Sequence, residues 1–230
     1  MRTLPLLAPA ALLLAAAACS SGAQTPADPA GAAAAEGALT LEATAAGAGQ
    51  SVAYFAGGCF WCLEASFERL AGVSDVVSGY SGGHTVDPTY EESNTGTTGH
   101  AEAVAVVYDS TAIDYRTLLD VFFVAHDPTT LNRQGPDVGT QYRSAIFFET
   151  PRQRALIAEV IDSVNAGGRY ADPVVTEVEP FDAWYDAEAY HQNYYELHPN
   201  QPYIRAVSRP KVEKVEKEFS GLLKPGFGKA

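Results

Sequence analysis

The chain has 230 residues, a formal net charge of −13 and 47 % hydrophobic residues. This length and apolar fraction are enough for one domain with a sizeable core. Lys and Arg form no dense cluster in the sequence, which argues against nucleic-acid binding, and the acidic balance mainly favours solubility.

Residues 1–19 are typical of a secretory signal. Arg2 precedes an apolar run, residues 4–18, which is too short for a normal membrane span and ends in small residues before Cys19. We therefore expect export, with Cys19 as the lipid-bearing N-terminus of a bacterial lipoprotein. Ala16 stands where such cleavage sites usually have Leu, and ordinary signal cleavage within the Ala run is the alternative.

Residues 20–50 consist mostly of Ala, Gly, Ser, Thr and Pro. This composition offers too little apolar surface to form a core and predicts a flexible tether. We therefore expect a folded catalytic domain over residues 51–230, anchored in the cell envelope and facing the periplasm or the exterior.

The patterning of the domain predicts alternating strands and helices. In chain order we expect a strand over 51–56, a helix from Cys59 to Gly72, a strand over 73–80, a polar loop over 89–99, a strand over 101–108 and a helix over 115–125. A long polar loop over 126–142, a strand over 144–149, a helix over 151–167, a strand over 174–178 and helices over 186–197 and 211–219 follow. This order predicts an α+β two-layer sandwich, with a mixed or antiparallel sheet, helices on one side and extra helices.

Cys59 and Cys62 lie between a strand end and a helix start, in the segment Gly57-Gly58-Cys59-Phe60-Trp61-Cys62. A thiol at a helix N-terminus meets the positive end of the helix dipole and free backbone N–H groups. We therefore expect a lowered pKa for Cys59 and a reactive thiolate. Cys62 follows one turn later, within reach of a disulfide.

Three interpretations of the cysteine pair compete. A zinc site needs two more ligands, but the five His have no ligand-pair spacing and no second C-x-x-C exists in the sequence. The second interpretation is a structural pair of buried, inert thiols. A redox or nucleophilic role is favoured, because one closely spaced pair does not make a disulfide-stapled scaffold.

Several motifs together make the chain resemble the methionine sulfoxide reductase A family. They are Gly58–Cys62 (GCFWC), 79–83 (GYSGG), 99–104 (GHAEAV), 126–129 (HDPT), 139–144 (GTQYRS) and 190–192 (YHQ), and the resemblance covers about residues 52–203. Thioredoxin-like proteins also use C-x-x-C but lack these accompanying blocks.

The resemblance implies a ferredoxin-like core and a role for each matching residue. Cys59 is the attacking thiolate and Glu102 the acid that protonates the departing oxygen; Tyr90 and Tyr142 hold the sulfoxide oxygen, Phe60 and Trp61 cage the methyl group, and Asp137 helps to hold the substrate backbone. Without the resemblance, Glu102 would be interpreted as a solvent-facing strand residue, the tyrosines and Phe60 as core, and Asp137 as a turn residue. Trp61 does not share the apolar spacing of its helix, which favours a role in the site.

The implied activity is reduction of the S epimer of methionine sulfoxide, free or in oxidised proteins, without metal or bound cofactor. The family often uses a resolving cysteine near the C-terminus, but residues 224–230 contain none. We therefore expect Cys62 to form a disulfide with Cys59, which a thioredoxin-like dithiol then reduces. The alternatives are an exported thiol–disulfide oxidoreductase and a lipoprotein binding module with inert thiols. No sequence feature predicts an oligomer, so we expect a monomer.

Overall fold

The computed structural model describes residues 49–228. The predicted signal segment, the lipidation site at Cys19 and nearly all of the predicted tether lie outside the described residues. Within the described part, no helix is both long enough and apolar enough to cross a membrane.

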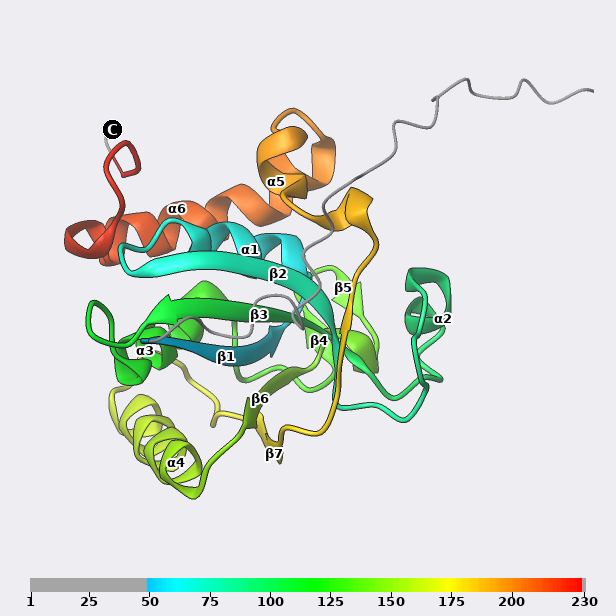
Figure 1. The fold of residues 1–230 in the computed structure, drawn as a ribbon, viewed down its shortest axis with the longest axis horizontal. Helices are drawn as coiled ribbons and strands as arrows, with labels where there is room; N and C mark the ends of the chain where they lie inside the picture. The colour runs from blue at the N-terminus through cyan, green and yellow to red at the C-terminus, as the bar shows by residue number, and fades with distance from the viewer. Residues whose placement is uncertain (1–48, 229–230) are drawn as a thin grey trace, which may run out of the picture. The chain divides into compact units, whose positions relative to one another are not determined.

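Six strands form one twisted mixed sheet (Figure 1). They are β1 (Gln50–Gly57), β2 (Val73–Ser81), β3 (Ala101–Asp109), β6 (Ser144–Phe148), β7 (Glu177–Pro180) and β8 (Trp184–Asp186), in the spatial order β7-β6-β1-β3-β2-β8. All neighbours are antiparallel except β6 and β7, which run parallel. The two short strands β4 (Arg133–Gln134) and β5 (Asp137–Val138) pair separately.

The helices include the two crossovers of the ferredoxin-like core. The helical segments are α1 (Phe60–Glu68), α2 (Tyr90–Asn94), α3 (Tyr115–Ala125), α4 (Pro151–Ala166), α5 (Tyr194–Leu197), α6 (Arg209–Glu218), 3₁₀ turns at Thr140–Tyr142, Ala189–His191 and Ser220–Leu222, and a π-helical turn at Ile204–Ser208. Because α1 links β1 to β2 and α3 links β3 to β6, the inner order β6-β1-β3-β2 is ferredoxin-like, and the α+β expectation is confirmed.

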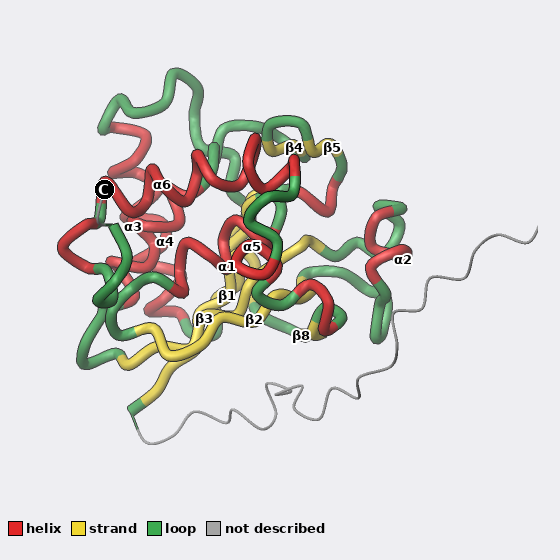
Figure 2. The backbone as a smooth tube through the Cα atoms, turned by 90° about the horizontal axis from the view of Figure 1, so that it is seen from above, coloured by secondary structure: helices red, strands yellow, loops and turns green. Residues whose placement is uncertain are grey.

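The two faces of the sheet are filled differently. The main core lies between the sheet and α1, α3, α4 and α6, which gather on one side of the strands (Figure 2). Phe55, Phe67 and Phe122 stack there at centroid distances of 5.1–5.2 Å. The opposite face carries alanines of β1, β3 and β6 with Tyr54 and Phe147, and it is covered by Phe181, which follows β7, and Trp184, which begins β8.

Three local predictions differ from the structure. The predicted loop over 89–99 contains α2, because Thr89 and Glu92 form a reciprocal capping box. The predicted helix over 186–197 is broken into the end of β8, a 3₁₀ turn and α5, and the strand predicted at 174–178 lies at β7 instead. Strand β8 was missed because it depends on pairing with β2, where a Cβ on Gly79 would come within 2.4 Å of Trp184.

Candidate active site

Gly58 shapes the turn that presents Cys59. It has φ +88°, and a Cβ there would lie 2.4 Å from Cγ of Gln134. Gln134 in turn accepts from the backbone N–H of Asp127 and donates to its carbonyl. Only glycine fits this conformation and this close approach, so the turn puts Cys59 at the N-cap of α1.

Most of the residues predicted for the site meet in one pocket. A cavity of about 230 Å³ is lined by Cys59, Phe60, Trp61, Tyr90, Glu102, Asp137, Tyr142, Gln201 and Tyr203. All the predicted catalytic and substrate-binding residues lie there except Cys62, which is buried one turn further along α1. Two carboxyl groups, one thiol and several hydroxyls therefore share a small space with aromatic walls.

Glu102 on β3 is inside the protein, 2 % exposed, and not on the solvent face of the strand. Its Oε2 accepts a hydrogen bond from the backbone N–H of Phe60, the first residue of α1, at 3.2 Å. Burial raises the pKa of Glu102 to about 8 against the lowering effect of that N–H, and Asp137 and Cys62 raise it further. Glu102 is therefore mainly protonated at neutral pH and can donate a proton.

The tyrosines of the pocket are positioned by side chains from distant segments, through the hydroxyls of Tyr142 and Tyr203 and the backbone of Tyr90. Tyr142 donates to Oδ1 of Asn94, the last residue of α2, at 3.2 Å, and the backbone N–H of Tyr90 donates to Glu188 at 2.8 Å. Tyr203 donates a hydrogen bond to Asp137. Burial raises the pKa values of all three tyrosines, so these phenols remain protonated donors.

Trp61 is held on three sides. Its indole stacks on Tyr194 of α5 at 3.9 Å, meets Tyr203 edge-on at 5.9 Å, and donates its Nε1–H to Nδ1 of His191 at 3.2 Å. A ring nitrogen that accepts carries no proton, so His191 is in the neutral Nε2–H form. Burial also lowers its pKa. The indole is therefore a rigid wall of the pocket.

The surroundings of Cys59 overturn the prediction of a lowered pKa. The side chain is 5 % exposed, and burial, Cys62 and Glu102 raise the pKa of Cys59 well above its usual value. The backbone N–H of Trp61 works in the opposite direction but does not compensate, and the N–H of Phe60 is already bonded to Glu102. The increase in pKa caused by burial is therefore larger than the decrease caused by the helix N-terminus, and Cys59 is a thiol in the resting protein.

Cys62 lies in contrasting surroundings between α1 and the start of α6. Its Sγ lies 3.3 Å from Oγ of Ser208, and both residues are at most 2 % exposed. The interaction with Cys59, the charge of Lys211 and the hydroxyl of Ser208 lower the pKa of Cys62 to about 7, although burial raises it. Cys62 is the thiol of the pair that ionises near neutral pH. Both cysteines are free.

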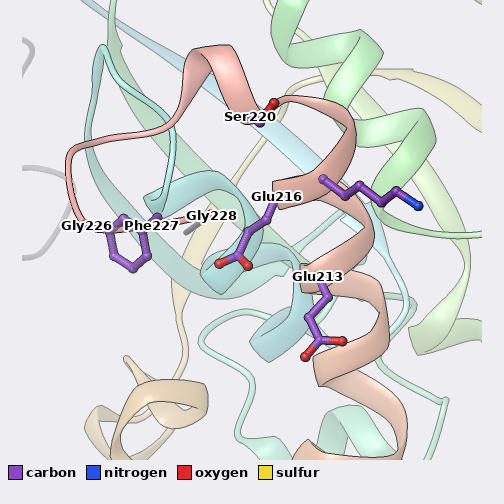
Figure 3. Close-up of a pocket in the computed structure, with 7 residues that line it drawn as sticks. Glu213, Glu216, Ser220, Gly226, Phe227 and Gly228 are labelled. Carbon is purple, nitrogen blue, oxygen red and sulfur yellow. The ribbon is translucent and has the colours of Figure 1, made fainter. Parts of the chain in front are cut away.

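A larger hollow of about 780 Å³ lies away from the cysteines, against the C-terminal half of α6 and the tail (Figure 3). It is lined by Glu213, Glu216, Lys217, Ser220, Gly226, Phe227 and Gly228. It contains no thiol or imidazole, and Glu216 is already paired with Arg69 at 2.7 Å. The smaller pocket is thus the candidate active site. Over residues 49–228, no group of three or more His, Cys, Asp and Glu is arranged to hold a metal ion.

Residues 51–222 match the family model described as peptide methionine sulfoxide reductase. The chain belongs to this family. Proteins named peptide methionine sulfoxide reductase MsrA are similar to it: that of Natronomonas pharaonis is 52 % identical over 170 residues, which cover 74 % of this chain and 96 % of the relative. That of Thermus thermophilus is 49 % identical over 176 residues, which cover 76 % and 99 %.

Two solved structures have a similar fold. Reduced Mxr1 from Saccharomyces cerevisiae superposes with a TM-score of 0.62 at 34 % identity, covering 66 % of this chain and 88 % of that one. Methionine sulfoxide reductase A of Corynebacterium diphtheriae gives 0.60 at 37 % identity, covering 67 % and 77 %. These likenesses lend no support to the alternative of a thiol–disulfide oxidoreductase.

Sequence reasoning missed several residues of the site. Gln201 and Tyr203 line the pocket, His191 and Tyr194 hold Trp61, and Ser208 contacts Cys62. His191 lies in a motif that carried the family resemblance, so its motif was a usable signal. The other four come from the segment 194–208, whose aromatic and polar residues have no periodicity that identifies a pocket.

Proposed function

We propose that this protein reduces the S epimer of methionine sulfoxide, free and in oxidised proteins, to methionine. The observation that carries the proposal is the meeting of a buried thiol, Cys59, with a protonated carboxyl, Glu102, in an aromatic pocket. Family membership supports the same reaction. No step below requires a metal or a bound cofactor.

Different residues of the pocket contact three parts of the substrate. The methyl group lies against Phe60 and Trp61, where apolar contact replaces water. The sulfoxide oxygen accepts hydrogen bonds from the hydroxyls of Tyr90 and Tyr142, the latter turning its proton from Asn94 to the substrate. Asp137, at the edge of the pocket in β5, accepts from the backbone of a peptide substrate.

The first step transfers the oxygen of the sulfoxide to the sulfur of Cys59. Glu102 gives its proton to the sulfoxide oxygen while the Cys59 sulfur attacks the substrate sulfur, and the proton of the Cys59 thiol restores Glu102. Collapse transfers the hydroxyl to Cys59, which leaves methionine and a Cys59 sulfenic acid. The raised pKa of both groups suits this route, because the pair starts neutral in a site with little water.

The second step regenerates the nucleophile. Cys62 attacks the sulfenic acid, water leaves, and a Cys59–Cys62 disulfide forms. An external dithiol of the thioredoxin type then reduces this disulfide. The lowered pKa of Cys62 and the location of both thiols in the first turn of α1 support this assignment.

The activity is tested with the purified protein, dithiothreitol and the separated S and R epimers of a blocked methionine sulfoxide. We expect loss of the S epimer alone, abolished in Cys59→Ser. Reduction of neither epimer by fully reduced protein would remove the proposed function. A Cys62→Ser protein that turns over unchanged with a thioredoxin system would remove the proposed disulfide instead.

Export and membrane tethering are part of the same proposal, and they rest on the sequence of residues 1–50 alone. Cys19 would carry the lipid and the following segment would hold the domain away from the membrane. Fractionation of cells tests this: Cys19→Ala should move the protein from the membrane to the soluble envelope fraction, and an unchanged distribution would contradict lipid attachment.

A further inference from the structure

Lys211 is an unusual residue in the interface between α6 and α1. Ser208, Lys211, Val212 and Val215 recur at helical spacing, and all but Lys211 are at most 1 % exposed. The Nζ atom of Lys211 is itself shielded from solvent and has no hydrogen-bond partner among the described residues. Lys211 also forms no ion pair with any described carboxylate. A buried ammonium without a partner is costly, so it requires an explanation.

Two groups influenced by the charge of Lys211 are candidates for its counter-ion. The positive charge of Lys211 influences Cys62 and His126. His126 cannot serve, because its ring nitrogens are bonded to the carbonyl of Phe122 and the hydroxyl of Ser144, both at 2.7 Å, and burial lowers its pKa to about 4. A neutral imidazole carries no charge to pair. Of these two groups Cys62 remains, and it becomes an anion on losing its proton.

Ser208 adds a directional contact to the same sulfur. It is the last residue of the π-helical turn that leads into α6, and it is fully buried with its Oγ 3.3 Å from Sγ of Cys62. A serine hydroxyl accepts from a thiol but can also rotate and donate to a thiolate. Local π-helical geometry is frequent at functional sites. One helical turn thus provides a hydrogen-bond donor and a positive charge for Cys62.

We propose that Ser208 and Lys211 form a thiolate-stabilising site that prepares Cys62 to attack the sulfenic acid on Cys59. This inference rests on the proposed function and on Cys62 as the resolving cysteine. Ser208 touches the reacting sulfur and is a catalytic residue on this assignment, whereas Lys211 acts through its field as a positioning residue.

The electron pair of the Cys62 thiolate forms the S–S bond to Cys59, and the S–O bond of the sulfenic acid breaks. The Cys62 sulfur is oxidised and the Cys59 sulfur is reduced. The hydroxyl leaves with the proton of Glu102 as water, and solvent restores that proton.

The first test measures the ionisation of Cys62 directly, by ultraviolet absorbance of the thiolate in a Cys59→Ser background. Lys211→Met keeps the length and loses the charge, and Lys211→Arg is the matched control that keeps the charge. We expect Lys211→Met to reduce the thiolate-to-thiol ratio at neutral pH about tenfold, equivalent to one pKa unit. Lys211→Arg should change it little. Equal titrations in all three proteins would overturn the proposal.

The second test follows one turnover in the full-length protein without reductant, with dimedone to trap sulfenic acid. We expect Lys211→Met and Ser208→Ala to lower the rate of disulfide formation, relative to the rate of sulfoxide reduction, about tenfold and severalfold. Trapped sulfenic acid should rise accordingly. An unchanged ratio in both variants would overturn the proposal.

The two tests also separate this inference from the proposed function. A protein that reduces no sulfoxide contradicts the proposed function, whereas the Cys62 titration still decides the role of Lys211. Lys211→Met should remain folded, because replacing an unpaired buried charge by an apolar side chain is neutral or stabilising. If Lys211 had only a structural role, Lys211→Met would lower the stability of the protein without changing the titration of Cys62. Ser208→Ala provides an independent variant.

Discussion

Cys59 and Cys62 lie one helical turn apart, yet the surroundings on the two sides of α1 shift the pKa of a thiol in opposite directions. On the pocket side, burial raises the pKa of Cys59, and Cys62 and the carboxyl of Glu102 raise it further. On the α6 side, the interaction with Cys59, the charge of Lys211 and the hydroxyl of Ser208 lower the pKa of Cys62 to about 7. Both residues belong to the same short motif, so tertiary surroundings, and not the helix N-terminus, assign their roles.

We expect the largest loss of activity from substitution of the cysteines, with a different kinetic result for Cys59 and Cys62. Cys59→Ser should lower kcat/KM for the S epimer by at least about 10⁴-fold, because the nucleophile is lost. Cys62→Ser should retain one rapid reduction per protein molecule and then stop under reductant conditions that require the disulfide. Single-turnover and steady-state assays distinguish the two; equal losses in single turnover would break the comparison.

The next effect tests the acid on the pocket side. Glu102→Gln should slow sulfoxide reduction about 10³-fold, because it removes the proton donor. In the parent protein the rate should fall as pH rises through about 8, since Glu102 loses its proton there.

Glu64 is the matched control for that pH dependence. It lies on α1, is 1 % exposed, also has a pKa raised by burial to about 8, and accepts from the backbone N–H of Asn193 at 2.9 Å. Glu64 does not line the pocket. Glu64→Gln should therefore keep the fall in rate near pH 8. If Glu64→Gln removes it, the acid has been assigned to the wrong carboxyl.

A backbone change should disturb the Cys59 side selectively. Gly58→Ala forces a positive φ on alanine and a Cβ into Gln134, which should lower the free energy of unfolding by about 3 kcal/mol. Gly135→Ala is the control: φ is +62° but nothing lies within 4 Å, so about 1 kcal/mol is expected. Chemical denaturation measures both. Similar losses would show that the contact with Gln134 does not constrain the turn.

The smallest expected effect concerns the pocket wall. His191→Asn keeps an acceptor near the position of Nδ1, whereas His191→Gln places its amide near Nε2. Loss of the bond to Trp61 is worth about 1 kcal/mol, so the Gln variant should raise KM about fivefold with little change in kcat. In a Trp184→Phe background, Trp61 is the sole tryptophan and its fluorescence reports the same loss. Identical behaviour of both variants would contradict the positioning role.

Much of this site could be predicted because its residues lie in compact motifs. The strand–glycine–cysteine–helix pattern located Cys59, and the family resemblance selected Glu102, which its own neighbours would have placed at the surface. The ionisation order of the cysteines could not be predicted, because it depends on burial, on the contact between the two thiols and on residues far away in the chain: the Cys62–Ser208 contact spans 146 residues. Strand β8 was not predicted for the same reason, because its partner β2 is distant in the chain.

The unpaired ammonium of Lys211 has a consequence for the energetics of the redox cycle. If the proposed disulfide forms, Cys62 can carry no charge, and Lys211 is left without a counter-ion among residues 49–228. The closed loop is too short to constrain the unfolded chain much, so the cross-link offers little stability in return. We therefore expect the oxidised protein to melt at a lower temperature than the reduced one, the reverse of a structural disulfide. A bond that weakens its own fold has a less negative reduction potential, and a dithiol donor can break it readily.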